Sequence, residues 1–451
     1  MQAPEAVDTG TRFQARAGLL AIIGLLYASA CGGPYGVENF VSKTGPGLFV
    51  LLLFVTPWLW GVPMALATAE LATLRPVEGG YYRWVREILG EFWGFQAGAS
   101  TLIASFLDNA LYPVLFSKSL RHWYPDLSAN QQWLAAVAFI AILTYLNYLG
   151  IRIAGGAAVA LNLLLIAPLA WIALAGFARA RFNPLIPFTP PGVSPWAGFG
   201  GGLALAMWFY SGYAEMSTAA EEMRDPARNI PRALLIVTPF VVLSYVAPFL
   251  ASLAAVGGWT GWQSGHFMVI GEALGGAALA RWVFLGSVAS QTVIFMAYLL
   301  WYSRICWALA ADGWLPSFFA RLHPRRGTPD RVLLAYAVIY SILARIDFED
   351  LLVADIWVTG AYHLLLLASL VRARTTLPDR PPGFRVPGGS PGAWVNFLVP
   401  AATWVVVLGT TARGHIRLCA TALLLPPALY VAERLIARRP QAGRSDRSRL
   451  P

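Results

Sequence analysis

The stretch CGGPYGVENF, residues 31–40, interrupts an apolar run that is otherwise long enough to cross a membrane. It places three glycines, Pro34 and Glu38 where a continuous helix would carry apolar side chains. Glycine loosens a helix, and proline kinks it and removes a backbone donor. Irregular backbone at membrane depth is tolerated only where protein buries it or where it lines a cavity. The stretch therefore predicts a broken membrane helix whose free backbone groups face a site, with closer helix packing by small residues as the alternative.

The composition of the whole chain is that of a membrane protein. Of its 451 residues 57% are hydrophobic and 12% are charged, whereas about 25% of residues in soluble domains are charged. A membrane-spanning helix needs roughly 20 mainly apolar residues. We therefore predict an all-α integral membrane protein with about twelve spans. These lie near residues 17–42, 46–74, 93–117, 131–149, 155–177, 197–221, 234–256, 279–308, 331–346, 351–371, 393–411 and 415–436.

The net charge of +10 is unevenly distributed between the two predicted sides. With the N-terminus inside, 24 of the 33 Lys and Arg residues fall on the cytoplasmic side. This is the positive-inside pattern, so the charge orients the chain in a lipid bilayer and does not indicate a nucleic-acid partner. We expect cytoplasmic tails at residues 1–16 and 439–451, the second disordered. The abundance of arginine over lysine favours the inner membrane of a bacterium.

The chain lacks the residues that several classes of function require. The five histidines and three cysteines are scattered over separate segments, so no metal site, cofactor or disulfide is predicted, and no catalytic residue either. Neither of the two lysines lies in a phosphate-binding loop, which excludes an ATP-driven pump unless another chain supplies the nucleotide site. A lipoprotein signal ending at Cys31 is an alternative for the N-terminus, but cleavage would remove half of a membrane helix.

A second interruption lies five spans later, in FGGGLALAMWFYSGYAEMSTAAEEM, residues 199–223. Again a Gly-Tyr pair near the middle of a span is followed by an acid. Interrupted spans at matching positions in two halves of a chain indicate an inverted-repeat transporter. Within one membrane domain at residues 17–438, we expect repeats at about 17–177 and 197–371, followed by two extra helices at 393–436.

The motifs taken together identify a family resemblance. GGPYGVE, ALATAELATLRPVEGGYYRWVREILGEFWGFQAG, DNALYPVLF, STAAEEMRDPARNIPRAL and PGFRVPGG resemble the amino acid–polyamine–organocation superfamily, nearest to its polyamine-uptake and L-type amino acid branch. The resemblance covers residues 17–436. It implies two inverted five-helix repeats with helices 1 and 6 discontinuous, alternating access around a central site, and secondary transport that is usually proton-linked.

The chain departs from this family at two points. Members commonly have an aromatic residue and Asp after the second Ser-Gly, whereas here Tyr213-Ala214 follows Ser211-Gly212 and the acid is Glu215. A shift of one residue turns a helical side chain by about 100°. A lysine that some proton-coupled members carry in the fifth span is also absent here.

Acidic residues within spans are functional candidates because each is expensive to insert. Glu38 follows the first break, Asp108 lies mid-span, Glu215 follows the second break and Asp355 lies near the start of the tenth span. We expect Glu38, Asp108 or Glu215 to carry a coupling proton, with His363 as a further candidate. The alternatives are a helix-start acid without substrate for Glu38 and a structural Asp–Asn network with Asn109 for Asp108. Asp355 can equally face a neighbouring helix, and His363 can simply be hydrogen-bonded.

The predicted substrate site combines both breaks, these acids and nearby aromatic residues. Its aromatic side chains are expected to enclose an alkyl chain or to contact an ammonium group through cation–π interactions. The predicted residues are Gly32, Gly33, Pro34, Tyr35, Gly36, Glu38, Asp108, Tyr210, Ser211, Gly212, Tyr213, Glu215 and Trp357.

Acids near the cytoplasmic ends of the spans are expected to form gating salt bridges with arginines. Glu221 and Glu222 precede Arg224, and Glu70 and Glu78 are interpreted in the same way.

The residues around the first break favour a cationic substrate. Pro34 removes an amide that could bind a carboxylate, and Glu38 adds negative charge nearby. We therefore expect uptake of a polyamine such as putrescine or spermidine by symport with protons through alternating access. An amino acid permease or an amino acid/amine exchanger is the alternative, because the remaining glycine amides can bind a carboxylate. A channel and a ligand-binding sensor are further alternatives. The sequence does not indicate an oligomeric state.

Overall fold

The computed structural model describes residues 17–121, 123–376 and 383–437, and helices account for most of them. The predicted tails at residues 1–16 and 439–451 lie outside the described residues. The only extended pairing within these ranges is an isolated bridge between Ala17 and Met223. The helical elements are α1 (Leu19–Ala30), α2 (Asn39–Thr44), α3 (Pro46–Thr56), η1 (Pro57–Gly61), α4 (Val62–Leu74), α5 (Gly80–Leu89), α6 (Glu91–Leu120), α7 (Ala129–Tyr148), α8 (Ile151–Ala178), α9 (Pro195–Phe209), η2 (Glu215–Glu222), α10 (Pro226–Val256), η3 (Trp259–Gly261), α11 (His266–Ala311), η4 (Ser317–Ala320), α12 (Asp330–Leu343), α13 (Phe348–Thr376) and α14 (Gly389–Ala437).

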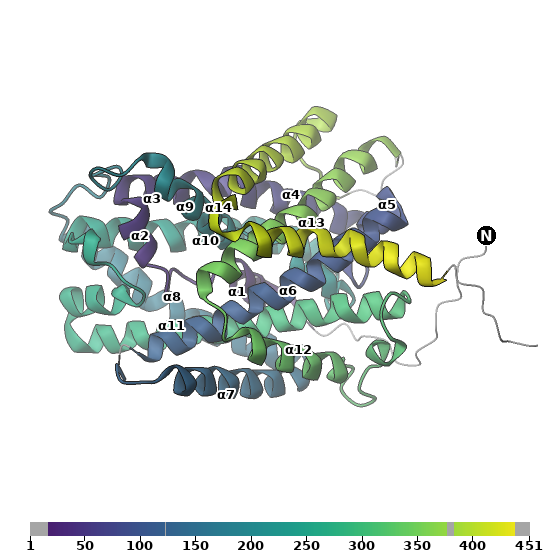
Figure 1. The fold of residues 1–451 in the computed structure, drawn as a ribbon, viewed down its shortest axis with the longest axis horizontal. Coiled ribbons are helices and arrows are strands. Elements are labelled where there is room, and N and C mark those ends of the chain that lie inside the picture. Colours follow the sequence, from purple (N-terminus) through teal and green to yellow (C-terminus); the bar gives the residue numbers. More distant parts are fainter. Residues whose placement is uncertain (1–16, 122, 377–382, 438–451) are drawn as a thin grey trace, which may run out of the picture.

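The long helices run back and forth along one direction, and segments from distant parts of the chain lie side by side (Figure 1). Nine helices in the described ranges are long and apolar enough to cross a membrane. Two of these spans lie within α14, at Gly389–Ala412 and His415–Ala432. The chain is thus an all-α integral membrane protein, as the composition predicts.

Three predicted spans are shorter than a membrane helix in the structure. α1 and the apolar part of α9 are short because each is one half of an interrupted span. α12, at the predicted ninth span, has 14 residues. The chain therefore crosses the membrane region partly with broken or short helices, and the two breaks lie where the glycines occur in the sequence.

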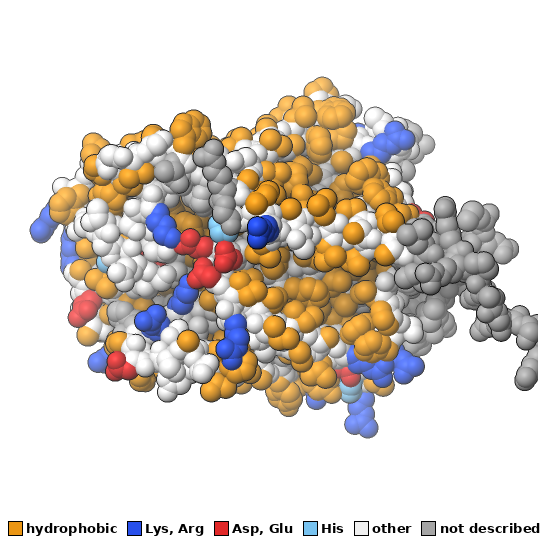
Figure 2. Space-filling model, in the orientation of Figure 1, with side chains coloured by type: hydrophobic (Ala, Val, Ile, Leu, Met, Phe, Trp, Pro, Cys, Tyr) orange, Lys and Arg blue, Asp and Glu red, His pale blue; other side chains and the backbone are white. Residues whose placement is uncertain are grey.

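Hydrophobic side chains form a broad band on the surface, with most charged side chains towards its two sides (Figure 2). Large apolar side chains on α7, α8 and α10 are exposed, as expected for helices that face lipid. By contrast α6, α11 and α13 are mainly buried, and α6 packs against both of the others. This central bundle holds the polar side chains that the membrane would otherwise disfavour.

The amphipathic helix α5 lies beside the end of α6 and the second break. Its Tyr81, Tyr82 and Trp84 are buried, whereas the charged residues on its other face are partly exposed. α5 therefore separates a buried aromatic face from a charged face. Because α5 contacts both α6 and η2, it connects the end of the bundle to the second break.

Candidate functional site

The first break consists of the residues between α1 and α2. Gly33 and Gly36 have φ values of 72° and 86°, in the left-handed region that glycine adopts without strain. At Gly32 an added Cβ would lie 1.7 Å from a side-chain carbon of Ile294 on α11. The hydroxyl of Ser290 donates a hydrogen bond to the carbonyl of Gly32. Gly33 and Gly36 therefore suit the turn, and Gly32 lies close to α11.

The second break begins where α9 ends at Phe209, and it crosses the first. Gly212 has a φ of 87°, and an added Cβ would lie 2.2 Å from the carbonyl oxygen of Ser29. The hydroxyl of Ser29 donates to the carbonyl of Gly212 at 3.2 Å. The two interrupted helices thus touch through their backbones, although 183 residues separate these partners.

A π-helical turn in the second span packs against the second break. η1 is a π-helical turn, a feature that often occurs at functional sites. Trp60 within it donates from its indole nitrogen to Ser211 at 3.1 Å. Gly61 lies against the second break, since an added Cβ would be 3.1 Å from Tyr210. The π turn therefore places a tryptophan and a bare backbone directly against residues 210–211.

A small cavity of about 20 Å³ lies between the two breaks. The first break, the ends of α1 and α9, and α6, α10 and α11 contribute to its wall, including Gly32, Gly33, Tyr35, Tyr112 and Trp208. A single water needs a cavity of roughly 10–15 Å³ by this measure. The conformation in the structure is thus closed around the centre, and a larger ligand requires the surrounding helices to separate.

Asp108 lies in the wall behind this cavity and is almost wholly buried, with 3% of its surface exposed. Its carboxylate accepts hydrogen bonds from the indole of Trp208 at 2.8 Å and from the hydroxyls of Tyr302 at 2.8 Å and Tyr112 at 3.2 Å. All three donors are neutral. The hydrogen bonds satisfy the oxygen atoms, but none of these partners supplies the opposite charge.

The rings around Asp108 form a continuous stack. Tyr112 stacks on Trp208 at 5.8 Å and on Tyr298 at 5.9 Å, and Tyr298 stacks on Tyr302 at 5.0 Å, measured between ring centroids. Tyr112, Trp208 and Tyr298 also line the cavity. A buried carboxylate beside aromatic faces is an arrangement that suits an organic cation.

Glu215 belongs to a second buried cluster, on the side of α13. Its Oε1 accepts from the hydroxyl of Tyr362 at 2.7 Å and lies 3.3 Å from Nε2 of His363. Its Oε2 is buried and has no hydrogen-bond partner, and neither do the two ring nitrogens of His363. The Trp60 ring and the imidazole of His363 are in a T-shaped arrangement, with their ring centroids 5.6 Å apart. The carboxylate and the imidazole are thus close together and buried from water, but they form no hydrogen bond in this conformation.

Glu38 has different hydrogen-bond partners from Asp108 and Glu215. Its carboxylate accepts from the backbone amides of Gly265 at 2.8 Å and Phe267 at 3.3 Å. These amides belong to the start of α11, where a negative charge is favoured by the free N–H groups. Glu38 therefore connects the first break to the beginning of α11.

The other predicted site residues are buried near the breaks, but several have partners outside the cavity. The Tyr210 hydroxyl donates to the carbonyl of Leu53 at 2.8 Å, and the Trp357 indole donates to Thr411 on α14 at 2.9 Å. The Tyr213 hydroxyl is buried without a hydrogen-bond partner. Only part of the predicted set is thus gathered around one centre, formed by Gly32, Gly33, Tyr35 and, behind it, Asp108.

The aromatic partners of Asp108 are not among the site residues predicted from the sequence. Tyr112 lies four residues after it, which places both side chains on one face of α6. Tyr298 and Tyr302 have the same spacing on α11. This i, i+4 spacing is the signal that was available, although it does not show which helices face each other.

Buried ion pairs hold the end of the bundle that carries Ala17. Arg374 donates to both carboxylate oxygens of Glu70, at 2.8 and 2.5 Å. The guanidinium of Arg304 lies 2.6 Å from Glu222, and both side chains are almost fully buried. Glu222 thus pairs with an arginine of α11, and the adjacent Arg224 is exposed.

Glu78 and Glu221 form a different connection at the same end. Each carboxylate accepts from the backbone amide of the other residue, at 3.2 and 3.3 Å. The segment before α5 and the end of η2 are therefore joined by two reciprocal hydrogen bonds.

Comparison with known proteins adds family relationships to this geometry. The profile of the family described as "Amino acid permease" matches residues 18–424. Polyamine transporter PUT1 of Oryza sativa subsp. japonica is 33% identical over 422 residues, covering 92% of this chain and 78% of that protein. Polyamine transporter RMV1 of Arabidopsis thaliana is 31% identical over 399 residues, covering 87% and 80% respectively. The branched-chain amino acid permease BcaP of Bacillus subtilis is 25% identical over 403 residues, covering 81% and 82%.

Proposed function

Because the chain belongs to the amino acid permease family, we propose that it is a secondary active transporter that takes up polyamines such as putrescine or spermidine. The observation that carries this proposal is the buried carboxylate of Asp108, which has three neutral donors and a wall of stacked aromatic rings. The similarity to two proteins named polyamine transporters supports the same substrate class.

An ammonium group supplies the positive charge that the neutral donors around Asp108 lack. When the cavity opens, one amino group of the substrate binds the carboxylate, and the faces of Tyr112 and Tyr298 contact the adjoining methylene groups. A cation over an aromatic face gains about 0.5–2 kcal/mol, more where water is excluded. A carboxylate placed in the same position would be repelled by Asp108. This contrast favours amines over amino acids.

The alternative is an amino acid permease or an amino acid/amine exchanger. It is supported by the description of the family and by the similarity to BcaP. The backbone of residues 32–36 would then bind the substrate carboxylate, as free amides at a helix break can do.

In alternating access, the cavity that is closed in this conformation opens first to one side of the membrane and then to the other. We assign residues 17–177 and 197–371 to two inverted repeats, whose broken helices cross at Ser29 and Gly212. Transport then requires the ion pairs Glu70–Arg374 and Glu222–Arg304 to separate in one half of the cycle. The other end opens when Lys43 on α2 leaves Glu349 on α13.

The coupling ion is assigned to the pair formed by Glu215 and His363. Of the three acids considered for this role, Glu215 has a buried oxygen without a hydrogen-bond partner and an imidazole 3.3 Å from the other oxygen. A proton taken up there would neutralise the carboxylate and alter its contact with Tyr362. In this proposal Asp108 binds the substrate, and Glu38 connects the first break to α11.

We place the protein in the inner membrane of a bacterium with both termini in the cytoplasm. The excess of arginine at the end of the bundle that carries Ala17 supports this orientation.

Uptake of radiolabelled putrescine into proteoliposomes, with and without an inward proton gradient, tests the proposal. We expect uptake that the gradient stimulates and that spermidine inhibits, whereas lysine, arginine and leucine do not compete. Competition by these amino acids, or uptake that depends on internal amino acid, would favour the alternative. Absence of concentrative uptake in correctly inserted protein would refute secondary transport.

A further inference from the structure

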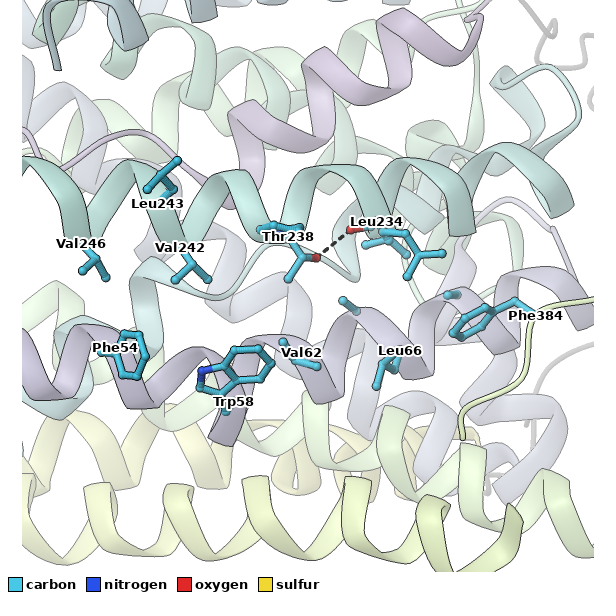
Figure 3. A pocket seen from close by; sticks show the side chains of 14 residues that line it. Phe54, Trp58, Val62, Leu66, Leu234, Thr238, Val242, Leu243, Val246 and Phe384 are labelled. Carbon is cyan, nitrogen blue, oxygen red and sulfur yellow. Dashed lines mark hydrogen bonds between the residues drawn. The ribbon is translucent and has the colours of Figure 1, made fainter. Parts of the chain in front are cut away.

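A large groove lies on the outside of the bundle, away from the two breaks. It has a volume of about 600 Å³ and runs between α10 on one side and α3, η1 and α4 on the other (Figure 3). Trp58 and Leu243, from its two sides, are 61% and 62% exposed. The groove therefore opens onto the apolar surface of the protein.

The lining of the groove suits a hydrocarbon chain. Its one hydroxyl, that of Thr238, already donates to the carbonyl of Leu234 at 2.7 Å. Apart from the indole N–H of Trp58, the other lining side chains are apolar, so the groove has no charged group to bind an amine or an amino acid. Its volume is in the range of roughly 300–1,000 Å³ that holds small organic ligands.

The length of the groove matches one leaflet of a bilayer. On α10 the lining extends from Leu234 to Val246, which is about 18 Å at 1.5 Å per residue. Half of a hydrocarbon core of about 30 Å is about 15 Å. One acyl chain lying along α10 therefore fills the groove from the membrane surface to near its midplane.

The end of the groove near Leu234 is closed by the segment that precedes α14. Phe384 lines the groove at this end (Figure 3). Gly383 packs on the end of α4, since an added Cβ would lie 1.8 Å from Cγ2 of Thr73. The Thr73 hydroxyl also donates to the carbonyl of Ala227 at 3.3 Å. The groove thus ends where α4, α10 and this segment meet.

Three exposed arginines lie on the two segments that meet at this end. Arg228 and Arg232 precede the lining residue Leu235 on α10 by seven and three residues, so they lie on the same helix face. Arg385 directly follows Phe384. The apolar groove therefore ends beside positive charge, which is complementary to an anionic headgroup at the membrane surface.

We propose that the groove binds one acyl chain of an anionic phospholipid whose phosphate lies among Arg228, Arg232 and Arg385. The site is separate from the substrate cavity. A neutral phospholipid fills the apolar part equally well but gains less from the arginines.

Native mass spectrometry of the purified full chain tests this site with dioleoyl phosphatidylglycerol and dioleoyl phosphatidylcholine at equal concentrations. The wild-type protein is expected to retain phosphatidylglycerol in preference. Each arginine near a membrane surface contributes about a fivefold gain. The double variant Arg228→Gln/Arg232→Gln should therefore bind phosphatidylglycerol about 30-fold more weakly, with binding of phosphatidylcholine unchanged.

Two further variants separate the headgroup from the chain. Val242→Trp fills the groove and should weaken binding of both lipids, and Arg321→Gln, an exposed arginine elsewhere, should alter neither. Equal retention of the two lipids by the wild-type protein would overturn the proposal. So would unchanged phosphatidylglycerol binding in the double variant, and the single variant Arg385→Gln repeats this test if the double variant does not fold.

Discussion

Replacing Asp108 with asparagine separates its charge from its hydrogen bonds. Trp208 and Tyr112 both donate to Oδ1, and Tyr302 donates to Oδ2. An asparagine keeps the first two contacts, and its amide can donate to Tyr302 because a hydroxyl accepts as well as donates. The variant should therefore fold with the aromatic stack intact and lose only the negative charge.

The expected effect is a weaker affinity for polyamine. A hydrogen bond that involves charged groups is worth about 1.5–3 kcal/mol, and each 1.4 kcal/mol is a factor of ten. Asp108→Asn should therefore raise the putrescine concentration for half-maximal uptake by roughly 10- to 150-fold. Competition against radiolabelled putrescine in proteoliposomes measures this change.

Asp355→Asn is the matched control. Asp355 is also a buried acid, but it accepts from Thr359 on its own helix at 3.0 Å. It should change the half-maximal concentration much less than Asp108→Asn does. An unchanged half-maximal concentration in Asp108→Asn protein that is correctly inserted would refute the assignment of Asp108 to the ammonium group.

Three further predictions concern the proton, the crossing and the closed end. Glu215→Gln should leave polyamine exchange intact but abolish stimulation of uptake by a proton gradient, and persisting stimulation would contradict its coupling role. Gly212→Ala should destabilise the protein by more than about 2 kcal/mol in a thermal unfolding assay, because this position combines a left-handed backbone with a contact of 2.2 Å for the added Cβ. Gly258→Ala is the control in the same assay. Gly258 has a φ of 60° but open space around it, so this variant tests the backbone strain alone. Glu70→Gln should lower thermal stability by leaving Arg374 without its carboxylate, and the double variant Glu70→Gln/Arg374→Gln should recover part of the loss; equal stability of all three proteins would show that the pair contributes little.

The positions of the breaks could be predicted from sequence, whereas their partners could not. Gly33 and Gly212 adopt backbone conformations that glycine favours, so a local signal marks both turns. The close approach of Gly212 to Ser29 depends on how two distant helices cross. No local pattern contains that information.

The acids show the same limit. Asp108, Glu215 and Glu38 are recognisable as buried from their apolar surroundings in the sequence. Their roles depend on partners far along the chain: Trp208 is 100 residues from Asp108, and Gly265 is 227 residues from Glu38. A side chain two residues away on a helix does not face its neighbour, which explains why the partner of an acid is seldom the next arginine in the sequence.

The two ends of the membrane domain are held with unequal strength. Lys43–Glu349 is an exposed pair, with half of the lysine side chain accessible, and such pairs contribute about 0–1 kcal/mol. Glu222–Arg304 is buried, and separating a buried pair costs about 3–5 kcal/mol when a charge is left unpaired. In the proposed alternating-access cycle, the end that carries Lys43 is therefore expected to open at a lower cost than the end that carries Ala17. Capture of substrate from the Lys43 side is then the less costly half of that proposed cycle, and opening of the Ala17 side is the more costly half.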